Sequence, residues 1–201
     1  MDNALRPVVF LDRDGTLNEE VGYIRDVSNL VLIKGAGAAV KKLNESGVAA
    51  VLVTNQSGVA RGYYPEDHIA KLHERLLNLL KAEGASLDAL YFCPHLPEGS
   101  VEPFNRVCDC RKPEPGMVSR AFAEHPDFDR SRSYVVGDKS TDVELAEKAG
   151  ATGVLVTTGF GQDVLEGKYQ WPVQPDHTAA NITEAVEWIL EDLQQAKQGR
   201  C

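Results

Sequence analysis

Short runs of consecutive apolar residues alternate with segments of helical periodicity along almost the whole chain. The runs read as short buried strands, and in the segments between them apolar side chains recur three and four residues apart, as on one face of a helix. The expected strands are residues 8–11, 48–53, 87–92, 134–136 and 153–156, and the expected helices are residues 35–46, 65–84, 115–125, 141–149 and 182–197. This alternation predicts an α/β fold with a single Rossmann-like parallel sheet and helices on both faces.

Length and composition fit one globular domain. A chain of 201 residues can bury a substantial core, and no internal repeat or low-complexity linker divides it. Its 43% hydrophobic and 25% charged residues argue against a disordered, collagen-like or coiled-coil chain. We therefore expect one domain over residues 1–201, with an irregular loop at residues 93–110.

The formal net charge of −9 bears on the partners that the protein can bind. Proteins that bind the phosphate backbone of nucleic acids usually carry a basic stripe, so we expect no nucleic-acid partner. A small phosphorylated substrate is still compatible with this charge, because one local cluster of Arg and Lys is enough to bind it.

Neither a signal peptide nor a transmembrane segment is evident. The N-terminus from Met1 to Arg6 runs directly into the first expected strand, and no run approaches the roughly 18 apolar residues that span a bilayer. We expect a cytoplasmic protein with no membrane partner. The lack of an obvious exposed apolar stripe predicts a monomer.

Polar residues suited to catalysis follow the expected strands at the points where the strands end. In parallel sheets of this kind, ligands bind beyond the carboxyl ends of the strands, near the switch in strand order. The polar residues at these ends are Asp12, Asp14, Thr54, Arg111, Lys112, Asp138 and Lys139. Their shared position predicts a ligand site at that edge of the sheet.

Asp12 and Asp14 stand two residues apart at the first strand end and can point into the same cleft. Close carboxylates repel one another unless a cation intervenes, and Mg²⁺ suits one or two carboxylates together with a substrate phosphate. We expect Asp12 to attack phosphorus and form an aspartyl-phosphate, while Asp14 protonates the leaving alkoxide and then deprotonates the hydrolytic water. A simple turn is the alternative, because Asp and Gly favour turns. A calcium loop of the EF-hand kind fits poorly, since its glycine belongs at the sixth position and Gly15 falls fourth.

Further residues could complete such a site. Thr54 offers a hydroxyl and residues 55–58 offer backbone N–H groups to phosphate oxygens, although Thr54 could also be an ordinary strand end or helix cap. Lys112 could balance charge on the transferred phosphoryl group, or be a solvated surface lysine. Asp138 could be a third acidic magnesium ligand or a helix cap, and Lys139 could orient it or contact substrate.

Four motifs in this order resemble those of the haloacid dehalogenase superfamily of aspartate-nucleophile phosphotransferases. They are Asp12-Arg13-Asp14-Gly15-Thr16, Thr54-Asn55-Gln56-Ser57-Gly58, Lys112-Pro113 and Gly137-Asp138-Lys139-Ser140-Thr141-Asp142. Four motifs at four strand ends are much more specific than any one of them. The resemblance implies a magnesium-dependent enzyme with catalytic residues Asp12, Asp14, Thr54 and Lys112, and magnesium ligands Asp12, Asp14 and Asp138.

A Cys-x-His pair and a Cys-x-Cys pair lie close together in the irregular loop, as Cys93, His95, Cys108 and Cys110. In a reducing compartment such a cluster is more typical of a metal site than of disulfides. Three thiolates and one imidazole would complete a tetrahedral zinc site with no vacancy for water, which favours a structural ion. The alternative is three buried thiols and one surface histidine. Cys201, the last residue, has no evident partner.

The zinc loop ends immediately before Arg111 and Lys112. An ion that fixes the loop would also fix where these two side chains reach into the cleft. We therefore expect zinc to serve substrate positioning rather than bond breaking. Arg111 could bind a second anionic group, because its planar guanidinium suits phosphate, or it could be a solvated arginine.

The spacing of the motifs leaves no room for a folded cap domain. The residues between Asp14 and Thr54 already contain a helix and a strand, and those between Thr54 and Lys112 contain one helix, one strand and the zinc loop. We expect a capless cleft that is selective through nearby loops, such as residues 18–25 and the zinc loop.

Within the superfamily the chain resembles two groups of capless phosphatases with a zinc loop. One acts on a heptose bisphosphate, a precursor of the lipopolysaccharide core, and the other on histidinol phosphate. The resemblance rests on Gly22-Tyr23, on Arg61-Gly62, and on Cys108-Asp109-Cys110-Arg111-Lys112-Pro113-Glu114-Pro115-Gly116-Met117. It implies substrate contacts from Glu20, Val21 (through its backbone), Gly22, Tyr23, Thr54, Asn55, Gln56, Ser57, Arg111, Lys112 and Lys139.

We prefer the heptose bisphosphate as substrate. Its second phosphate needs a second anion site, which Arg111 or Lys139 could supply, whereas the cationic histidinol phosphate would better suit an acidic wall. Two other functions stay open. One is a non-catalytic, zinc-stabilised module that binds a phosphorylated ligand, although such a module needs no nucleophile. The other is a phosphomutase, which the lack of a lid to exclude water disfavours.

Overall fold

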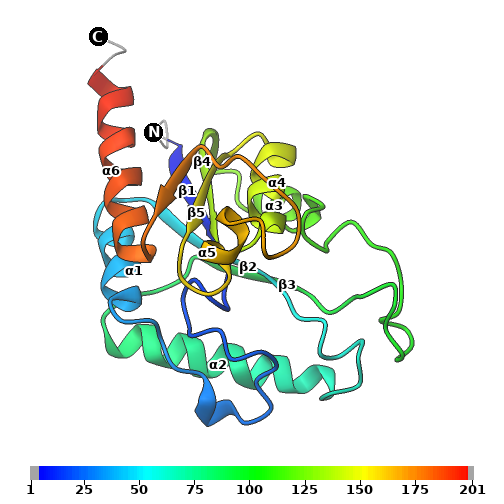
Figure 1. Cartoon of the computed structure of the whole chain (residues 1–201). Helices are drawn as coiled ribbons and strands as arrows, with labels where there is room; N and C mark the ends of the chain where they lie inside the picture. Colours follow the sequence, from blue (N-terminus) through cyan, green and yellow to red (C-terminus); the bar gives the residue numbers. More distant parts are fainter. Residues whose placement is uncertain (1–4, 199–201) are drawn as a thin grey trace.

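Six parallel strands form one sheet in the computed structural model, which describes residues 5–198 (Figure 1). The strands are β1 (Arg6–Leu11), β2 (Ala49–Asn55), β3 (Ala89–Cys93), β4 (Phe128–Gly137), β5 (Thr152–Val156) and β6 (His177–Ala179). The helices are the short 3₁₀ helix η1 (Val27–Asn29), α1 (Ala36–Glu45), α2 (Glu66–Ala82), α3 (Gly116–Glu124), α4 (Ser140–Ala149), α5 (Gly161–Leu165) and α6 (Ile182–Gln198). The strand order is β3-β2-β1-β4-β5-β6, with every neighbouring pair parallel.

The order of the strands reverses at β1. The chain moves outward from β1 to β3 and then crosses back to place β4 on the other side of β1. Leu11 at the end of β1 pairs with Leu52 of β2 and with Val136 of β4. The residues that follow these three positions therefore meet at one edge, at the switch point where ligands bind in open α/β sheets.

Side chains alternate between the two faces of β1, as the pleat of a strand requires. Val9 and Leu11 belong to the core cluster that is shared with α1, α2 and α6. Val8 and Phe10 belong to the cluster on the opposite face, which α3 and α4 complete. All four side chains are fully buried, so the strand that carries the first motif is fixed by packing on both sides. Figure 1 shows α1 beside α6 on one side of the sheet and α3 beside α4 on the other.

The predicted α/β fold, with its parallel sheet and helices on both faces, is confirmed, but the strand prediction was incomplete. β6 was missed because it has three residues, of which only Ala179 is buried, so it shows no periodicity. β4 begins at Phe128 rather than Tyr134, because the polar residues between them pair with β1 only across an irregular register. The five-residue helix α5 was not predicted either.

No helix within residues 5–198 is long and apolar enough to cross a membrane. The first four residues, on which the expectation about a signal peptide partly rests, lie outside the described part of the chain. Cys201, for which no partner was predicted, also lies outside it.

Candidate active site

A cavity of about 370 Å³ opens at the carboxyl edge of the sheet. Its lining brings together Asp12, Asp14, Glu20, Gly22, Tyr23, Thr54, Asn55, Gln56, Ser57, Arg61, Tyr64, Arg111, Lys112, Lys139, Thr141, Phe160, Tyr169 and Gln170. Two predicted site residues are not in this lining. The Val21 side chain is 57% exposed, and Asp138 is fully buried, with its carboxylate 2.9 Å from Lys139 Nζ. The volume suits a small phosphorylated molecule.

Lys112 is buried among acidic groups at the base of the cavity. Its Nζ lies 2.8 Å from Asp12 Oδ1 and 2.6 Å from Asp142 Oδ1, and it also donates to the Val53 carbonyl at 3.0 Å. Burial alone would raise the pKa of Asp12, but the ammonium groups of Lys112 and Lys139 reverse the effect and hold that pKa below its usual range. The Asp12 carboxylate is therefore kept ionised in a site where water has little access.

A second lysine, Lys139, lies between several oxygen atoms. Its Nζ is 2.9 Å from Asp138 Oδ1, 3.1 Å from Glu20 Oε2, 3.2 Å from the Asp14 carbonyl oxygen and 3.8 Å from Asp12 Oδ2. Burial would lower the pKa of Lys139, but these carboxylates outweigh it and raise the pKa. Glu20 thus takes part in the site through an ion pair with Lys139.

Asp138 reaches this cluster because glycine lies against it. Gly15 has φ +82°, and a Cβ there would come within 2.2 Å of Asp138 Oδ2. The Phe160 N–H donates to the same carboxylate at 2.9 Å. Burial raises the pKa of Asp138 to about 7; Lys139 acts against this shift, and the neighbouring Asp12 and Asp142 add to it.

The donor set fits a divalent cation. Oxygens of Asp12, Asp138 and Asp142 lie within 4.8 Å of one another. Together with Glu20, these carboxylates outnumber the two lysine ammonium groups by two, so the cluster has an excess of two negative charges when all are ionised. Carboxylate and carbonyl oxygens are the ligands that Mg²⁺ prefers. The main-chain carbonyl oxygen of Asp14 lies 3.2 Å from Lys139 Nζ, which also contacts Asp138.

The Asp14 carboxylate is held apart from this cluster by three donors. Arg13 Nη2 lies 2.8 Å from Oδ2, Gln56 Nε2 donates to Oδ2 at 3.0 Å, and Asn18 Nδ2 donates to Oδ1 at 3.0 Å. Arg13 is 1% exposed, so this orientation is fixed inside the protein. Asp12 and Asp14 therefore line one cavity from different surroundings, which suits two carboxylates with different tasks.

The amides of the second motif are engaged within the protein. Gln56 Nε2 also donates to Thr54 Oγ1 at 3.0 Å, so it links Thr54 to Asp14. Asn55 exchanges two hydrogen bonds of 3.0 Å with the main chain of Lys112. Both amides line the cavity, but their side-chain contacts position catalytic candidates.

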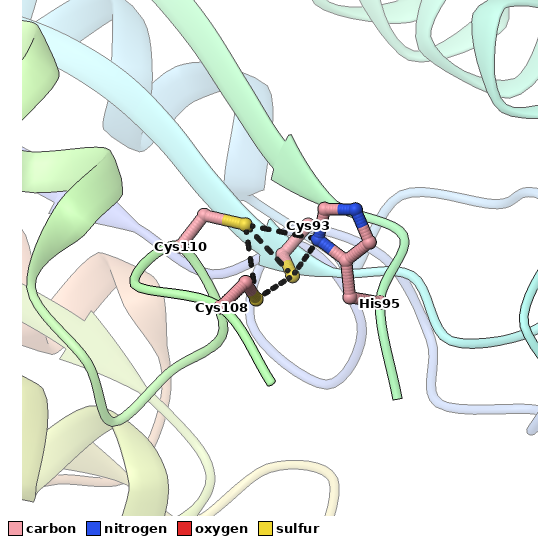
Figure 2. A group of neighbouring side chains, drawn as sticks. All are labelled: Cys93, His95, Cys108 and Cys110. Carbon is pink, nitrogen blue, oxygen red and sulfur yellow. Dashed lines mark hydrogen bonds between the residues drawn. The ribbon is translucent and has the colours of Figure 1, made fainter. Parts of the chain in front are cut away.

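The four predicted zinc ligands, Cys93 at the end of β3 and three residues of the loop that follows it, converge in space (Figure 2). The three sulfur atoms of Cys93, Cys108 and Cys110 lie 3.1–3.5 Å apart, and His95 Nδ1 is 3.3 Å from Cys110 Sγ and 3.7 Å from Cys93 Sγ. All three cysteines are free thiols. Burial and the hydrogen bond from Cys110 raise the pKa of Cys93, so the Cys93 thiolate is unfavourable without a cation. A bound zinc ion would stabilise that thiolate. The Cys₃His cluster fits a closed structural zinc site.

The zinc loop is joined directly to the cavity. Arg111 follows Cys110 and donates from Nη1 to the carbonyl oxygen of His95 at 3.0 Å, while its side chain lines the cavity. Lys112 comes next and is tied to the end of β2 through Asn55. Arg111 is therefore placed by a contact with a zinc-ligand residue, and Lys112 by a contact with the end of β2.

Sequence reasoning missed one wall of the cavity. Phe160 and Tyr169 stack with ring centroids 4.1 Å apart, and Lys139 lies 5.3 Å from the centre of the Phe160 ring. Gln170 beside them has φ +58°, which is uncommon for a residue other than glycine. Arg61, Tyr64 and Thr141 were also not assigned to the site.

Comparison with known proteins gives consistent similarities. A model of the HAD-hydrolase-like family matches residues 109–185. The D-glycero-D-manno-heptose-1,7-bisphosphate 7-phosphatase of Thermosynechococcus vestitus is 53% identical over 94% of this chain and 97% of its own length. The D-glycero-beta-D-manno-heptose-1,7-bisphosphate 7-phosphatase of Escherichia coli K12 is 42% identical over 96% of this chain and 92% of its own. The crystal structure of D,D-heptose 1,7-bisphosphate phosphatase from B. bronchiseptica, complexed with magnesium and phosphate, has a TM-score of 0.79 at 30% identity and covers 92% of this chain and 99% of that one.

Proposed function

The chain belongs to the HAD-like phosphatases, among the heptose-1,7-bisphosphate 7-phosphatases, and we propose on this premise that it removes the 7-phosphate from such a sugar bisphosphate. The observation that carries the proposal is the pair of carboxylates in one cavity: Asp12 is held ionised by Lys112, and Asp14 is oriented by three donors. A module that only binds phosphate would not need such a pair.

In the first step Asp12 acts as the nucleophile. Its carboxylate oxygen attacks the phosphorus of the 7-phosphate, and a phosphorus–oxygen bond to Asp12 forms as the bond to the sugar oxygen breaks. Asp14, protonated at this stage, gives its proton to the leaving sugar alkoxide. Lys112, buried beside Asp12, would stabilise the negative charge on the phosphoryl oxygens, and Thr54 would donate its hydroxyl to one of them.

In the second step Asp14 has become a carboxylate and acts as a base. It takes a proton from water, the water oxygen bonds to phosphorus, and the bond from phosphorus to Asp12 breaks. Inorganic phosphate leaves, and both side chains return to their starting states. The amide of Gln56, which joins Asp14 to Thr54, would keep the acid–base group aligned through both steps.

Asp12, Asp138 and the carbonyl oxygen of Asp14 would hold the magnesium ion. When bound, Mg²⁺ would neutralise charge between the carboxylates and the substrate phosphate. Lys139 lies within 4 Å of all three residues and would have to share this space with the ion. Zinc on the Cys₃His cluster would have a structural role, by fixing Arg111 at the cavity.

The charges of the cavity favour a bisphosphate over histidinol phosphate. Each acidic residue in the lining already has a partner: Asp12 with Lys112, Asp14 with Arg13, and Glu20 with Lys139. No unpaired carboxylate of the lining remains, within the described residues, to bind the amine of histidinol phosphate.

The proposal is tested by measuring phosphate release with Mg²⁺ from the heptose bisphosphate and from histidinol phosphate. The heptose bisphosphate should give the higher kcat/KM, and Asp12→Asn should abolish turnover. A higher kcat/KM for histidinol phosphate would reverse the choice of substrate. Binding of the bisphosphate with no phosphate release by the wild-type protein would instead indicate a non-catalytic module.

The proposal extends to the domain organisation, the compartment and the oligomeric state of the protein. The chain would act as one domain over residues 1–201, since strands from both ends of the described chain share one sheet. It would work in the cytoplasm, where the three thiols of the zinc cluster stay reduced. It would be a monomer, which sedimentation of the purified protein would test.

A further inference from the structure

Four cationic side chains line the cavity, and three of them are engaged inside the protein. Lys112 and Lys139 are held in ion pairs with buried carboxylates, and Arg111 donates to a main-chain carbonyl. The fourth, Arg61, has an exposed side chain that forms no hydrogen bond and no ion pair with any side chain or main-chain group of residues 5–196. Within the described residues, Arg61 is therefore the cationic side chain of the lining whose N–H groups donate to no other residue.

Local structure places Arg61 on the same side of the cavity as the second motif. The Arg61 N–H donates to the Ser57 carbonyl at 3.0 Å, and the Gly62 N–H donates to the Val59 carbonyl at 2.9 Å. Residues 57–62 thus form a turn that begins two residues after the end of β2. Ser57 and Arg61 both line the cavity, so this turn extends the cavity lining from Thr54 to the exposed Arg61 side chain.

One ring of a packed tyrosine pair lies against the Arg61 guanidinium. Arg61 lies over the Tyr23 ring at 5.9 Å from its centre, and Tyr23 packs edge-to-face against Tyr63 at 4.7 Å. Arg25 lies over the Tyr63 ring at 5.1 Å, on the other member of the pair, but does not line the cavity. The aromatic contacts restrain the Arg61 side chain and leave its N–H groups free to bind a ligand.

We propose that Arg61 binds the phosphate group of the substrate that is not transferred. This inference rests on the proposed function, since only a bisphosphate carries such a group. A second phosphate near Asp12, Asp14 and Glu20 is repelled unless a cation lies close to it, and the net charge of the chain is −9. A guanidinium with all five N–H groups unused can bind phosphate through two parallel hydrogen bonds. Arg61 therefore determines the preference for a bisphosphate over a monophosphate.

The test is the ratio of kcat/KM for heptose 1,7-bisphosphate to that for heptose 7-phosphate, which lacks the second phosphate. Losing a charge-assisted contact of this kind lowers that ratio about 10- to 100-fold, which is expected for Arg61→Ala. Arg61→Lys keeps the charge but not the paired hydrogen bonds, so its ratio should lie between those of the wild type and the alanine variant.

Arg25→Ala is the matched control, because it removes the other exposed arginine of the same aromatic group. Its ratio should equal that of the wild type. A general disturbance of the site by Arg61→Ala would lower both rates together and leave the ratio unchanged. A wild-type preference for the bisphosphate that survives in Arg61→Ala would overturn the inference and leave the proposed function standing. A wild-type protein with equal kcat/KM for the two sugars would contradict the inference and leave the proposed function standing, because the 7-phosphate would still be removed. No phosphate release from the bisphosphate would contradict the proposed function itself.

Discussion

Replacing Lys112 by Met removes one buried cation while keeping much of the side-chain volume. Lys112 is 3% exposed, and its ammonium lies 2.8 Å from Asp12 and 2.6 Å from Asp142. At an effective dielectric constant of about 20, each of these contacts represents an attraction of roughly 6 kcal/mol before desolvation. Most of this is offset in the wild type by the cost of burying the charges. Removing one partner of a buried ion pair typically costs about 3–5 kcal/mol, because it leaves the opposite charge uncompensated. We expect a loss of that size in the free energy of unfolding for Lys112→Met.

The assay is urea unfolding at pH 7 in magnesium-free buffer, with zinc retained. Lys148→Met is the control, because Lys148 pairs with Glu114 and Glu144 on the surface, where such pairs contribute about 0–1 kcal/mol. Combining Lys112→Met with Asp142→Asn should cost less than the sum of the two single losses, since both remove the same contact. A loss for Lys112→Met no larger than that for Lys148→Met, or strict additivity in the double variant, would refute this reasoning.

Three further predictions address other parts of the structure. Gln56→Leu should lower kcat at least tenfold with little change in KM, because it removes a donor that orients Asp14, and steady-state kinetics would show this; an equal kcat would contradict the assigned role. Cys108→Ser should lose zinc, measured by elemental analysis, and should lower kcat/KM by displacing Arg111; loss of zinc with kcat/KM unchanged would separate the loop from the site. Burial and the Arg13 guanidinium lower the pKa of His73 to about 3, so His73 stays neutral in the folded state. Because the unfolded state takes up this proton at the ordinary pKa of about 6.5, the free energy of unfolding is highest above about pH 6.5 and falls as the pH drops toward 3. Between pH 7 and pH 5 the wild type should lose about 2 kcal/mol more unfolding free energy than His73→Leu, and parallel pH profiles would contradict this.

The meeting of the candidate site residues at one edge of the sheet could be predicted from the sequence because these residues follow recognisable strands. Asp12 and Thr54 each come directly after an apolar run that is buried on both faces, and parallel strands bring such positions to one edge. The zinc ligands could be predicted for a different reason. A Cys-x-His pair and a Cys-x-Cys pair close together in one irregular loop are typical of a metal site in a reducing compartment.

The internal partners of the site residues could not be predicted in this way. The sequence places Asn55 and Gln56 after the expected strand at residues 48–53 but does not indicate whether their amides face a ligand or the protein. In the structure they bind Asp14, Thr54 and the main chain of Lys112. Such contacts depend on rotamers and on distances between strands that the pattern of apolar residues does not specify.

The wall formed by Phe160, Tyr169 and Gln170 escaped prediction because of where it lies. It follows β5: Phe160 immediately precedes the five-residue helix α5, and Tyr169 and Gln170 lie in the irregular segment after that helix, where no periodic pattern marks them. The stacked rings and the positive φ of Gln170 arise from tertiary packing. The same limit applies to β6, a strand of only three residues at the edge of the sheet.

The central claim is that Asp12 becomes phosphorylated during turnover. The most direct measurement is rapid acid quenching of the enzyme during turnover of the heptose bisphosphate, followed by mass spectrometry of its peptides. The account predicts one added phosphoryl group on the Asp12 peptide of the wild type, and neither this group nor turnover in Asp12→Asn. Turnover that persists in Asp12→Asn, or a phosphoryl group found on another residue, would contradict it.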